Sequence, residues 1–151
     1  MDLHQFLHDR LTDILNDASA AMTRSHVTHY EEAGPEHTHQ RLKALMVLTV
    51  RAVKERNLGP MVAHADGIAR ERFNAGFDLW EVQTAFNVLE EAIWMRLMKE
   101  LPPAELPEAL GLVSTILGVG KDTLARRYVS LAAKTRVPSL NLQSLFTGID
   151  G

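Results

Sequence analysis

Cysteine is absent from this chain of 151 residues, and its absence excludes several classes of protein. Without a thiol there can be no disulfide framework, no thiolate nucleophile and no zinc site with cysteine ligands. No apolar run approaches the roughly 18–20 residues that a membrane-spanning helix requires. A basic surplus is also missing, because the net charge is −3, so we expect no nucleic-acid partner.

The first fifteen residues, MDLHQFLHDRLTDIL, are amphipathic and contain acids, which is not the pattern of a signal peptide. We therefore expect a cytoplasmic protein with no membrane partner. The chain has the length of one ordinary domain, and its composition of 46% hydrophobic and 23% charged residues is close to the globular average.

Apolar residues recur three and four positions apart along most of the chain, which is the period of one helical face. The apolar/polar alternation that is typical of a strand does not persist anywhere with turn signals around it. The pattern predicts an all-α fold, a single compact bundle of five or six helices joined mostly by short loops.

Glycine and proline mark the expected helix boundaries. Gly34-Pro35 and Gly59-Pro60 each separate two helices, because glycine suits the end of a helix and proline suits the first turn. Asp2 is the expected N-cap of the first helix. Pro102 and Pro103 end the fourth helix, since proline cannot continue it.

The last helix is predicted to start near Leu106. Gly111, Gly118 and Gly120 lie inside it, and each costs about 1 kcal/mol relative to alanine in a helix interior. Either this helix breaks near Gly120, or another element packs closely against it. Pro138 is expected to end the regular pattern, which predicts a helical domain over residues 1–137 and a tail or linker over residues 138–151.

The stretch RERFNAGFDLWEVQTAFNVLEEAIW, residues 70–94, has the clearest local signals. Gly76 can end a helix in the left-handed region without a Cβ penalty. Asp78 and Glu81 have the spacing of a capping box at the start of the next helix. No functional role is predicted for the charged residues of this stretch, Arg70, Arg72, Glu90 and Glu91.

Three aromatic residues of the same stretch, Trp80, Phe86 and Trp94, are candidates for the wall of a ligand pocket. We favour the alternative that they pack helix on helix, because aromatic residues dominate protein cores. Residues 118–123, GVGKDT, lack the first glycine of a phosphate loop and the Ser or Thr that should follow the lysine. No catalytic motif is present, so an enzyme is not expected.

Six of the seven histidines lie in the first 39 residues. His4 and His8 are four apart on one helical face, a spacing that can chelate a divalent ion, and His26 and His29 form a second cluster. A single Glu-x-x-His sequence at residues 36–39 is too little for a di-iron site. We favour the interpretation that these histidines are mostly exposed polar positions. An axial haem ligand or a divalent metal site remains the alternative, and no cofactor is expected.

The segment of residues 64–94 resembles the N-terminal domain of RsbRD-type RsbT co-antagonist proteins. The shared pattern is Ile-Ala-x-x-Arg, then a glycine, then Leu-x-Glu-Val at the start of a helix, then Ile-Trp. The sequence RRYV at residues 126–129 also fits the family. The resemblance covers about residues 40–130, and the residues that carry it here are Ile68, Ala69, Arg72, Gly76, Leu79, Glu81, Val82, Ile93 and Trp94.

The resemblance implies an all-helical sensory or interaction module that controls an output domain, and some relatives resemble globins without haem. The expected function is therefore that of a non-catalytic bacterial signal-transduction domain, acting through helix repacking caused by a ligand or partner. A homodimer and a signalling protein or fused output domain are the expected partners. The alternative is a helical protein that binds a small molecule, haem or a metal through its N-terminal histidines.

Overall fold

The computed structural model describes residues 2–140, and it describes side chains as far as residue 135. Within these residues there is no strand, which confirms the all-α prediction. The described chain forms seven helices: α1 (Leu3–Asp9), α2 (Leu11–Ser25), α3 (Thr28–Ala33), α4 (Pro35–Glu55), α5 (Gly59–Asn74), α6 (Leu79–Glu100) and α7 (Leu106–Leu140).

The N-terminal segment contains more helices than its apolar spacing predicted. The expected first helix is divided between α1 and α2 at Arg10, whose backbone (φ −101°, ψ 7°) departs from helical values. Neither glycine nor proline marks this break, so no local signal predicted it. A further short helix, α3, follows His26, whose backbone is in the left-handed region (φ 51°). The predicted N-cap of the first helix is confirmed, because the Asp2 carboxylate accepts the His4 N–H at 3.0 Å.

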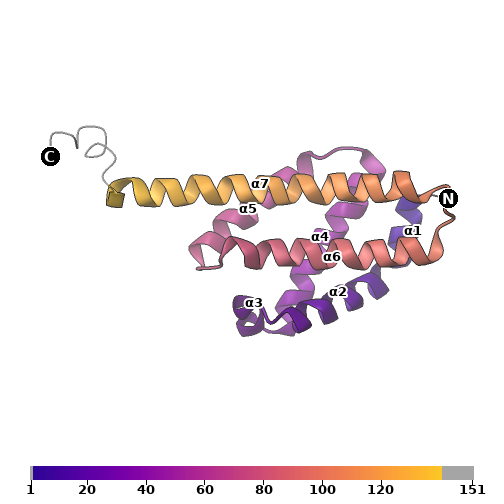
Figure 1. The fold of residues 1–151 in the computed structure, drawn as a ribbon, viewed down its shortest axis with the longest axis horizontal. Helices are drawn as coiled ribbons and strands as arrows, with labels where there is room; N and C mark the ends of the chain where they lie inside the picture. The colour runs from indigo at the N-terminus through magenta and orange to yellow at the C-terminus, as the bar shows by residue number, and fades with distance from the viewer. Residues whose placement is uncertain (1, 141–151) are drawn as a thin grey trace.

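Helices α6 and α7 lie side by side and antiparallel along the length of the molecule (Figure 1). Helix α5 packs against α7, and α2 packs against the other side of α6. Helix α4 contacts α1, α2, α5, α6 and α7, and so runs through the centre of the arrangement. The helices therefore surround the core instead of forming two flat layers.

Helix α7 is continuous through its three internal glycines. A Cβ atom added to Gly120 would lie 2.7 Å from Phe86 Cε2 and 3.1 Å from Met61 Sδ. Of the two alternatives for this helix, close packing against another element is therefore correct, and a break is wrong. A side chain at position 120 would prevent α5 and α6 from approaching α7 as they do.

Tyr128 is the last buried residue of α7 among those with described side chains, and the next residue, Val129, is 67% exposed. The helix then extends past the other helices (Figure 1). It passes Pro138 and is described as far as Leu140, so the expectation that Pro138 ends the regular pattern is wrong. The rest of the predicted tail, residues 141–151, lies outside the described residues.

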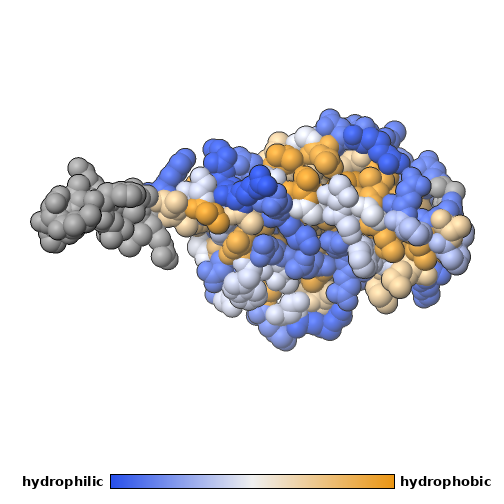
Figure 2. All heavy atoms as spheres, turned by 45° about the horizontal axis from the view of Figure 1, so that its top comes forward, coloured by the Kyte–Doolittle hydropathy of each residue, from blue (hydrophilic) through white to orange (hydrophobic). Residues whose placement is uncertain are grey.

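Apolar residues reach the surface in several separate groups among hydrophilic ones, on the face that Figure 2 presents. The large hydrophobic residues that are most exposed include Met95, Met98 and Val129. Across residues 2–140, none of the helices combines the length and the hydropathy needed to cross a membrane.

Candidate functional site

The C-terminus of α5 ends in a Schellman motif, and this motif sets the course of the chain into α6. Gly76 has a positive φ of 87°. Its N–H donates to the Phe73 carbonyl at 3.1 Å, and the Phe77 N–H donates to the Arg72 carbonyl at 2.9 Å, which is the bonding pattern of that motif. The predicted helix end at Gly76 is thus confirmed, and Phe77 is turned into the core, where it is 8% exposed.

Helix α6 begins with the predicted capping box, in which Asp78 is the N-cap and Glu81 the N3 residue. The Glu81 carboxylate accepts the Asp78 N–H at 2.7 Å. Glu81 is only 1% exposed, whereas N3 glutamates of capping boxes are commonly found at the surface. A buried carboxylate is costly unless other groups hydrogen-bond to it, and a residue from another helix supplies these bonds.

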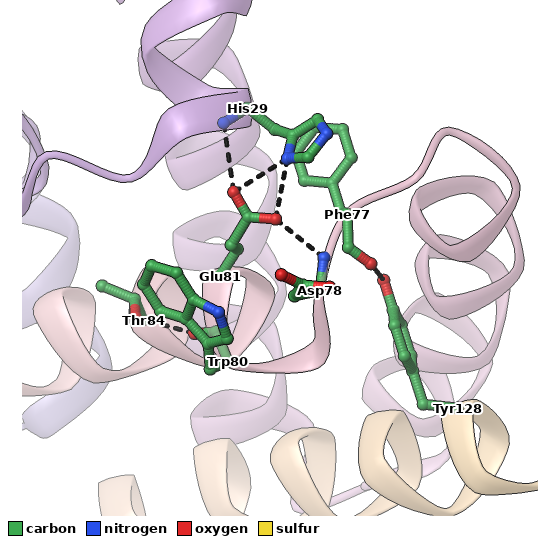
Figure 3. Close-up of polar contacts among 7 residues, drawn as sticks. All are labelled: His29, Phe77, Asp78, Trp80, Glu81, Thr84 and Tyr128. Carbon is green, nitrogen blue, oxygen red and sulfur yellow. Dashed lines mark hydrogen bonds and ion pairs between the residues drawn. The ribbon is translucent and has the colours of Figure 1, made fainter. Parts of the chain in front are cut away.

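That residue is His29 of α3, which lies 52 positions away in the sequence (Figure 3). Its Nδ1 lies 2.8 Å from Glu81 Oε2, and its backbone N–H donates to Glu81 Oε1 at 3.1 Å. The Glu81 carboxylate therefore bonds to the start of α6 and to the start of α3 together. One buried side chain closes the contact between these two helices.

The pKa values of His29 and Glu81 both shift in the direction that favours an ion pair between them. The hydrogen bond that His29 donates to Glu81 and the charges of Glu81, Glu32 and Asp78 raise the pKa of His29, although burial opposes the rise. Burial alone would raise the pKa of Glu81, but hydrogen bonds from His29 and from the Asp78 N–H reverse this and lower it. The charged forms of both residues are thus stabilised by the same contact.

Phe77 and Tyr128 extend this junction to α7. The Phe77 ring stacks on the His29 ring at a centroid distance of 4.7 Å. The Phe77 carbonyl accepts the Tyr128 O–H at 3.0 Å (Figure 3). Burial raises the pKa of Tyr128 to about 12, so its hydroxyl stays protonated and able to donate. Helices α3, α5, α6 and α7 therefore meet at one connected set of polar contacts, which we call the α6 junction: His29, Phe77, Asp78, Glu81 and Tyr128.

Two arginines lie beside the α6 junction, Arg41 from α4 and Arg72 from α5. Their guanidinium carbons are 5.4 Å and 5.9 Å from the centroid of the Phe77 ring. The Arg72 side chain is 6% exposed, and its Nη1 donates to the neighbouring Glu71 carboxylate at 2.7 Å. Burial and the charge of Arg72 lower the pKa of Arg41, as expected where two cations lie close together.

These arginines line a cavity of about 260 Å³ between α4, α5 and α6. Burial, together with the charge of Arg72, lowers the pKa of His64 in the same wall, so His64 is held in its neutral form near pH 7. The remaining walls are largely apolar. The residues that line the cavity are Tyr30, His37, Gln40, Arg41, Leu42, Ala44, Leu45, His64, Ile68, Glu71, Arg72, Val82, Ala85 and Phe86.

The structure does not bring the three candidate aromatic residues together. Phe86 is 1% exposed and lines the arginine cavity, while Trp80 and Trp94 are 53% and 37% exposed. Six residues of helix correspond to a rotation of about 240°, and fourteen to about 40° short of four full turns, so around α6 Phe86 lies about 120° from Trp80 and about 80° from Trp94. Trp94 lines a separate depression of about 300 Å³ on the surface of α6. The favoured helix-packing interpretation therefore describes Phe86 but not the two tryptophans.

The four candidate metal ligands are dispersed. The rings of His4 and His8 lie 6.4 Å apart on α1, His26 contacts Glu31 at 3.1 Å, and His29 bonds to Glu81. Nowhere in the described part of the chain do three or more histidine or acidic side chains gather in a group that could hold a metal ion. The arrangement gives no support to the alternative function based on these histidines, and metal binding stays a prediction.

Sequence reasoning assigned no functional role to Arg72 or to Tyr128. A signal for Arg72 was available: it continues the three- and four-residue spacing of Met61, Ala65 and Ala69 along the buried face of α5. Nothing local indicated the partner of Tyr128, since the Phe77 carbonyl is 51 residues away.

Comparison with protein-family models gives one match, to the family described as "RsbT co-antagonist protein rsbRD N-terminal domain", over residues 36–136. The matched region contains nearly all of α4, all of α5 and α6 and most of α7, and with them all residues that line the arginine cavity except Tyr30 and all of the α6 junction except His29. Comparisons with the curated proteins and with the solved structures gave no significant match.

Proposed function

The chain belongs to the RsbRD N-terminal domain family, which is a family of regulatory signalling domains, and from this we infer that it is a non-catalytic sensor domain. In this function a ligand or partner changes the packing of the helices, and α7 carries the change to an output protein or domain. The observation that supports this assignment most directly is the place of the α6 junction, where α7 leaves the body of the molecule.

The mechanism requires two packing states to which the signal binds with unequal affinity. The α6 junction is suited to such a choice, because one carboxylate holds α3 to α6 and one hydroxyl holds α7 to the same point. Loss of the bond between Tyr128 and Phe77 would free α7 at the last residue that anchors it. Residues 129–140 extend about 18 Å beyond this residue and would form the connection to the output.

Amide hydrogen exchange of α7 tests this mechanism. We expect the variant Tyr128→Phe to exchange faster than the wild type in residues 129–140, because the hydroxyl that holds the helix is gone. Thr115→Val is the matched control, since it removes a hydroxyl of the same helix that bonds only to the Gly111 carbonyl within α7. Equal exchange of residues 129–140 in Tyr128→Phe and the wild type would argue against α7 as the output element.

The regulatory role itself is tested by the genetic context of the coding sequence. A histidine kinase or an anti-sigma antagonist that is fused to this domain or encoded beside it agrees with the proposal. A metabolic operon with no regulator in it contradicts the proposal.

A homodimer is part of the proposed function, and the outer face of α6 is its proposed interface. Trp94, Met95 and Met98 are 37%, 63% and 59% exposed there. Glu91 and Lys99 lie four residues on either side of Met95, on the same line of the helix. A two-fold axis at Met95 would therefore pair Glu91 of each copy with Lys99 of the other, which favours a second copy as the occupant.

Light scattering coupled to size exclusion measures the oligomeric state. We expect a dimer for the wild type and a monomer for Met95→Glu, which would bring two acids together at the axis. Val47→Glu is the control, because Val47 is similarly exposed, at 48%, on another helix, α4. A wild-type protein that remains monomeric at high micromolar concentration excludes this interface.

A further inference from the structure

We propose that the cavity lined by Arg41 and Arg72 is a binding site for a small organic carboxylate. The carboxylate group would bind to the two guanidinium groups, and the apolar part of the ligand would lie against Phe86 and the aliphatic walls. The claim that such a ligand is the signal rests on the proposed sensor function. The claim that the cavity binds it depends only on the contacts of the cavity.

The charge of the cavity favours an anion. The described residues that line it include two guanidinium groups and one carboxylate, that of Glu71. The Glu71 side chain is 65% exposed and contacts Arg72 at the surface, so water weakens its compensation of the buried charge. Arg41 has no ion-pair partner within the described chain, and its pKa is lowered by burial and by Arg72. A single negative charge would relieve the repulsion between the two cations.

Unused hydrogen-bond donors point to the same class of ligand. Within the described residues, Arg41 Nη1 and Arg72 Nε are buried and have no acceptor. A buried polar atom without a partner costs about 1–3 kcal/mol, and more if it is charged. Such atoms are rare in native proteins, so two of them in the wall of one cavity require an explanation. A carboxylate is an acceptor that matches the planar fork of an arginine.

The shape of the cavity selects an organic anion over an inorganic one. Apart from the charged groups and two histidines, its wall is mainly aliphatic and aromatic, including Leu42, Ile68 and Phe86. A cavity of about 150 Å³ is known to hold benzene, so about 260 Å³ has room for a ring or a short chain with a carboxylate. Inorganic phosphate would bind to the arginines but would leave the apolar wall in contact with water, which forgoes the hydrophobic contribution.

Calorimetric titration of the whole chain with defined probes tests the proposal. Benzoate and hexanoate are the carboxylates, benzyl alcohol and benzylamine are the neutral and cationic analogues, and inorganic phosphate is the anion without an apolar part. We expect saturable binding of at least one carboxylate, and affinity at least tenfold weaker for the analogues and for phosphate. Failure of both carboxylates to bind overturns the proposal, and so does equal binding of benzyl alcohol or of phosphate.

Arginine variants locate the binding. Arg41→Met should weaken carboxylate binding at least tenfold. Arg51→Met is the matched control on the same helix, because Arg51 is exposed and paired with Glu55 at 3.0 Å, and it should bind like the wild type. Arg72→Met removes a buried charge and can unfold the protein, so Arg41→Met is the deciding variant. Its circular dichroism is compared with that of the wild type to confirm that it is folded. Undiminished binding by folded Arg41→Met overturns the assignment.

The same protein separates failure of the site from failure of the sensor function. If carboxylate binds but hydrogen exchange in residues 129–140 does not respond, the site stands and its role as the signal fails. If no carboxylate binds but Tyr128→Phe still accelerates exchange in residues 129–140, the site is wrong and the role of α7 stands.

Discussion

Two of the contacts that position α7 against α6 work by different means. At Gly120 the two helices, with Met61 of α5, meet through apolar atoms at a distance that leaves no room for a Cβ. At the α6 junction, the buried Tyr128 hydroxyl of α7 donates to the Phe77 carbonyl just before α6, and the buried Glu81 carboxylate accepts the Asp78 N–H at the start of α6. The first contact is specified by shape, and the second by charge and hydrogen bonding.

In the proposed function, this difference separates the contacts that would respond to a signal from those that would not. Any displacement weakens a close-packed apolar contact, and such a contact does not respond to pH or to small anions. The α6 junction contains one imidazole, His29, whose pKa is raised by its hydrogen bond to Glu81, and it lies beside the arginine cavity. A regulatory domain needs both kinds of contact, one to keep the helices together and one to change.

The apolar contact should show the largest loss of stability when it is broken. Phe86 is fully buried, so Phe86→Ala is expected to lower the free energy of unfolding by about 3–5 kcal/mol, from lost burial and the cavity left behind. Urea denaturation monitored by circular dichroism measures this change. Trp80→Ala is the control on the same helix, and because Trp80 is 53% exposed it should cost about 0.5 kcal/mol or less. Similar losses in the two variants would contradict the placement of Phe86.

The α6 junction should be next in size. Glu81→Gln keeps the shape of the side chain but removes the charge that accepts hydrogen bonds from His29 and Asp78. We expect a loss of about 2 kcal/mol in urea denaturation at pH 6, within the range for a buried hydrogen bond to a charged group. Glu108→Gln, which changes an exposed acid in the first turn of α7, should be close to neutral. An unchanged free energy of unfolding in Glu81→Gln would show that the buried carboxylate does not stabilise the fold.

Two glycines of α7 should respond to the same substitution with opposite signs. Gly120→Ala forces a Cβ against Phe86 and Met61, which costs about 1–3 kcal/mol and outweighs the gain in helix propensity of about 1 kcal/mol. Gly118→Ala meets no atom within 4 Å, so it should raise the melting temperature through propensity alone. If Gly120→Ala also stabilises the protein, the helices do not approach as closely as described.

The smallest effect should be the pH dependence of the ion pair. The folded pKa of His29 is raised, so its contribution is fully present below pH 6.5 and is lost as the pH rises through that raised value. The folded pKa of Glu81 is lowered, so its contribution is present above pH 4.5 and is lost as the pH falls through the lowered value. The stability lost in His29→Gln should therefore be greatest between about pH 4.5 and 6.5 and smaller at pH 8.

A double-mutant cycle isolates this contribution. In the background of Glu81→Gln, the change His29→Gln should cost the same at pH 6 and pH 8, because the carboxylate that raises the pKa of His29 is missing. A pH dependence that persists in this background would assign the effect to Glu32 or Asp78, which also raise the pKa of His29.

Features that depend on neighbouring residues were predicted from the sequence, and features that depend on distant ones were not. Gly76, Asp78 and Glu81 lie within six residues, so the helix end and the capping box could be read directly. The bond from His29 to Glu81 spans 52 residues, and no local pattern encodes it. The break at Arg10 has no glycine or proline to mark it in the sequence.

The family resemblance pointed to residues whose role only the structure explains. Arg72, Gly76 and Glu81 were among the residues that carried it, and they now lie in one place, around Phe77. Their spacing in the sequence reflects two consecutive helix ends. What the spacing could not convey is that Arg72 and Glu81 are buried, and that α4 and α3 bring Arg41 and His29 to them.

The close approach at Gly120 also gives α7 the geometry of a lever. Phe86 and Met61 hold the helix at this point as a fulcrum, and Tyr128 lies eight residues further on, about 12 Å along the axis. The end of the described helix, Leu140, is twenty residues from the fulcrum, or about 30 Å. A displacement of about 1 Å at the Tyr128 hydroxyl would therefore become about 2.5 Å at Leu140. The absence of a side chain at Gly120 thus determines how much a displacement at Tyr128 would increase by Leu140.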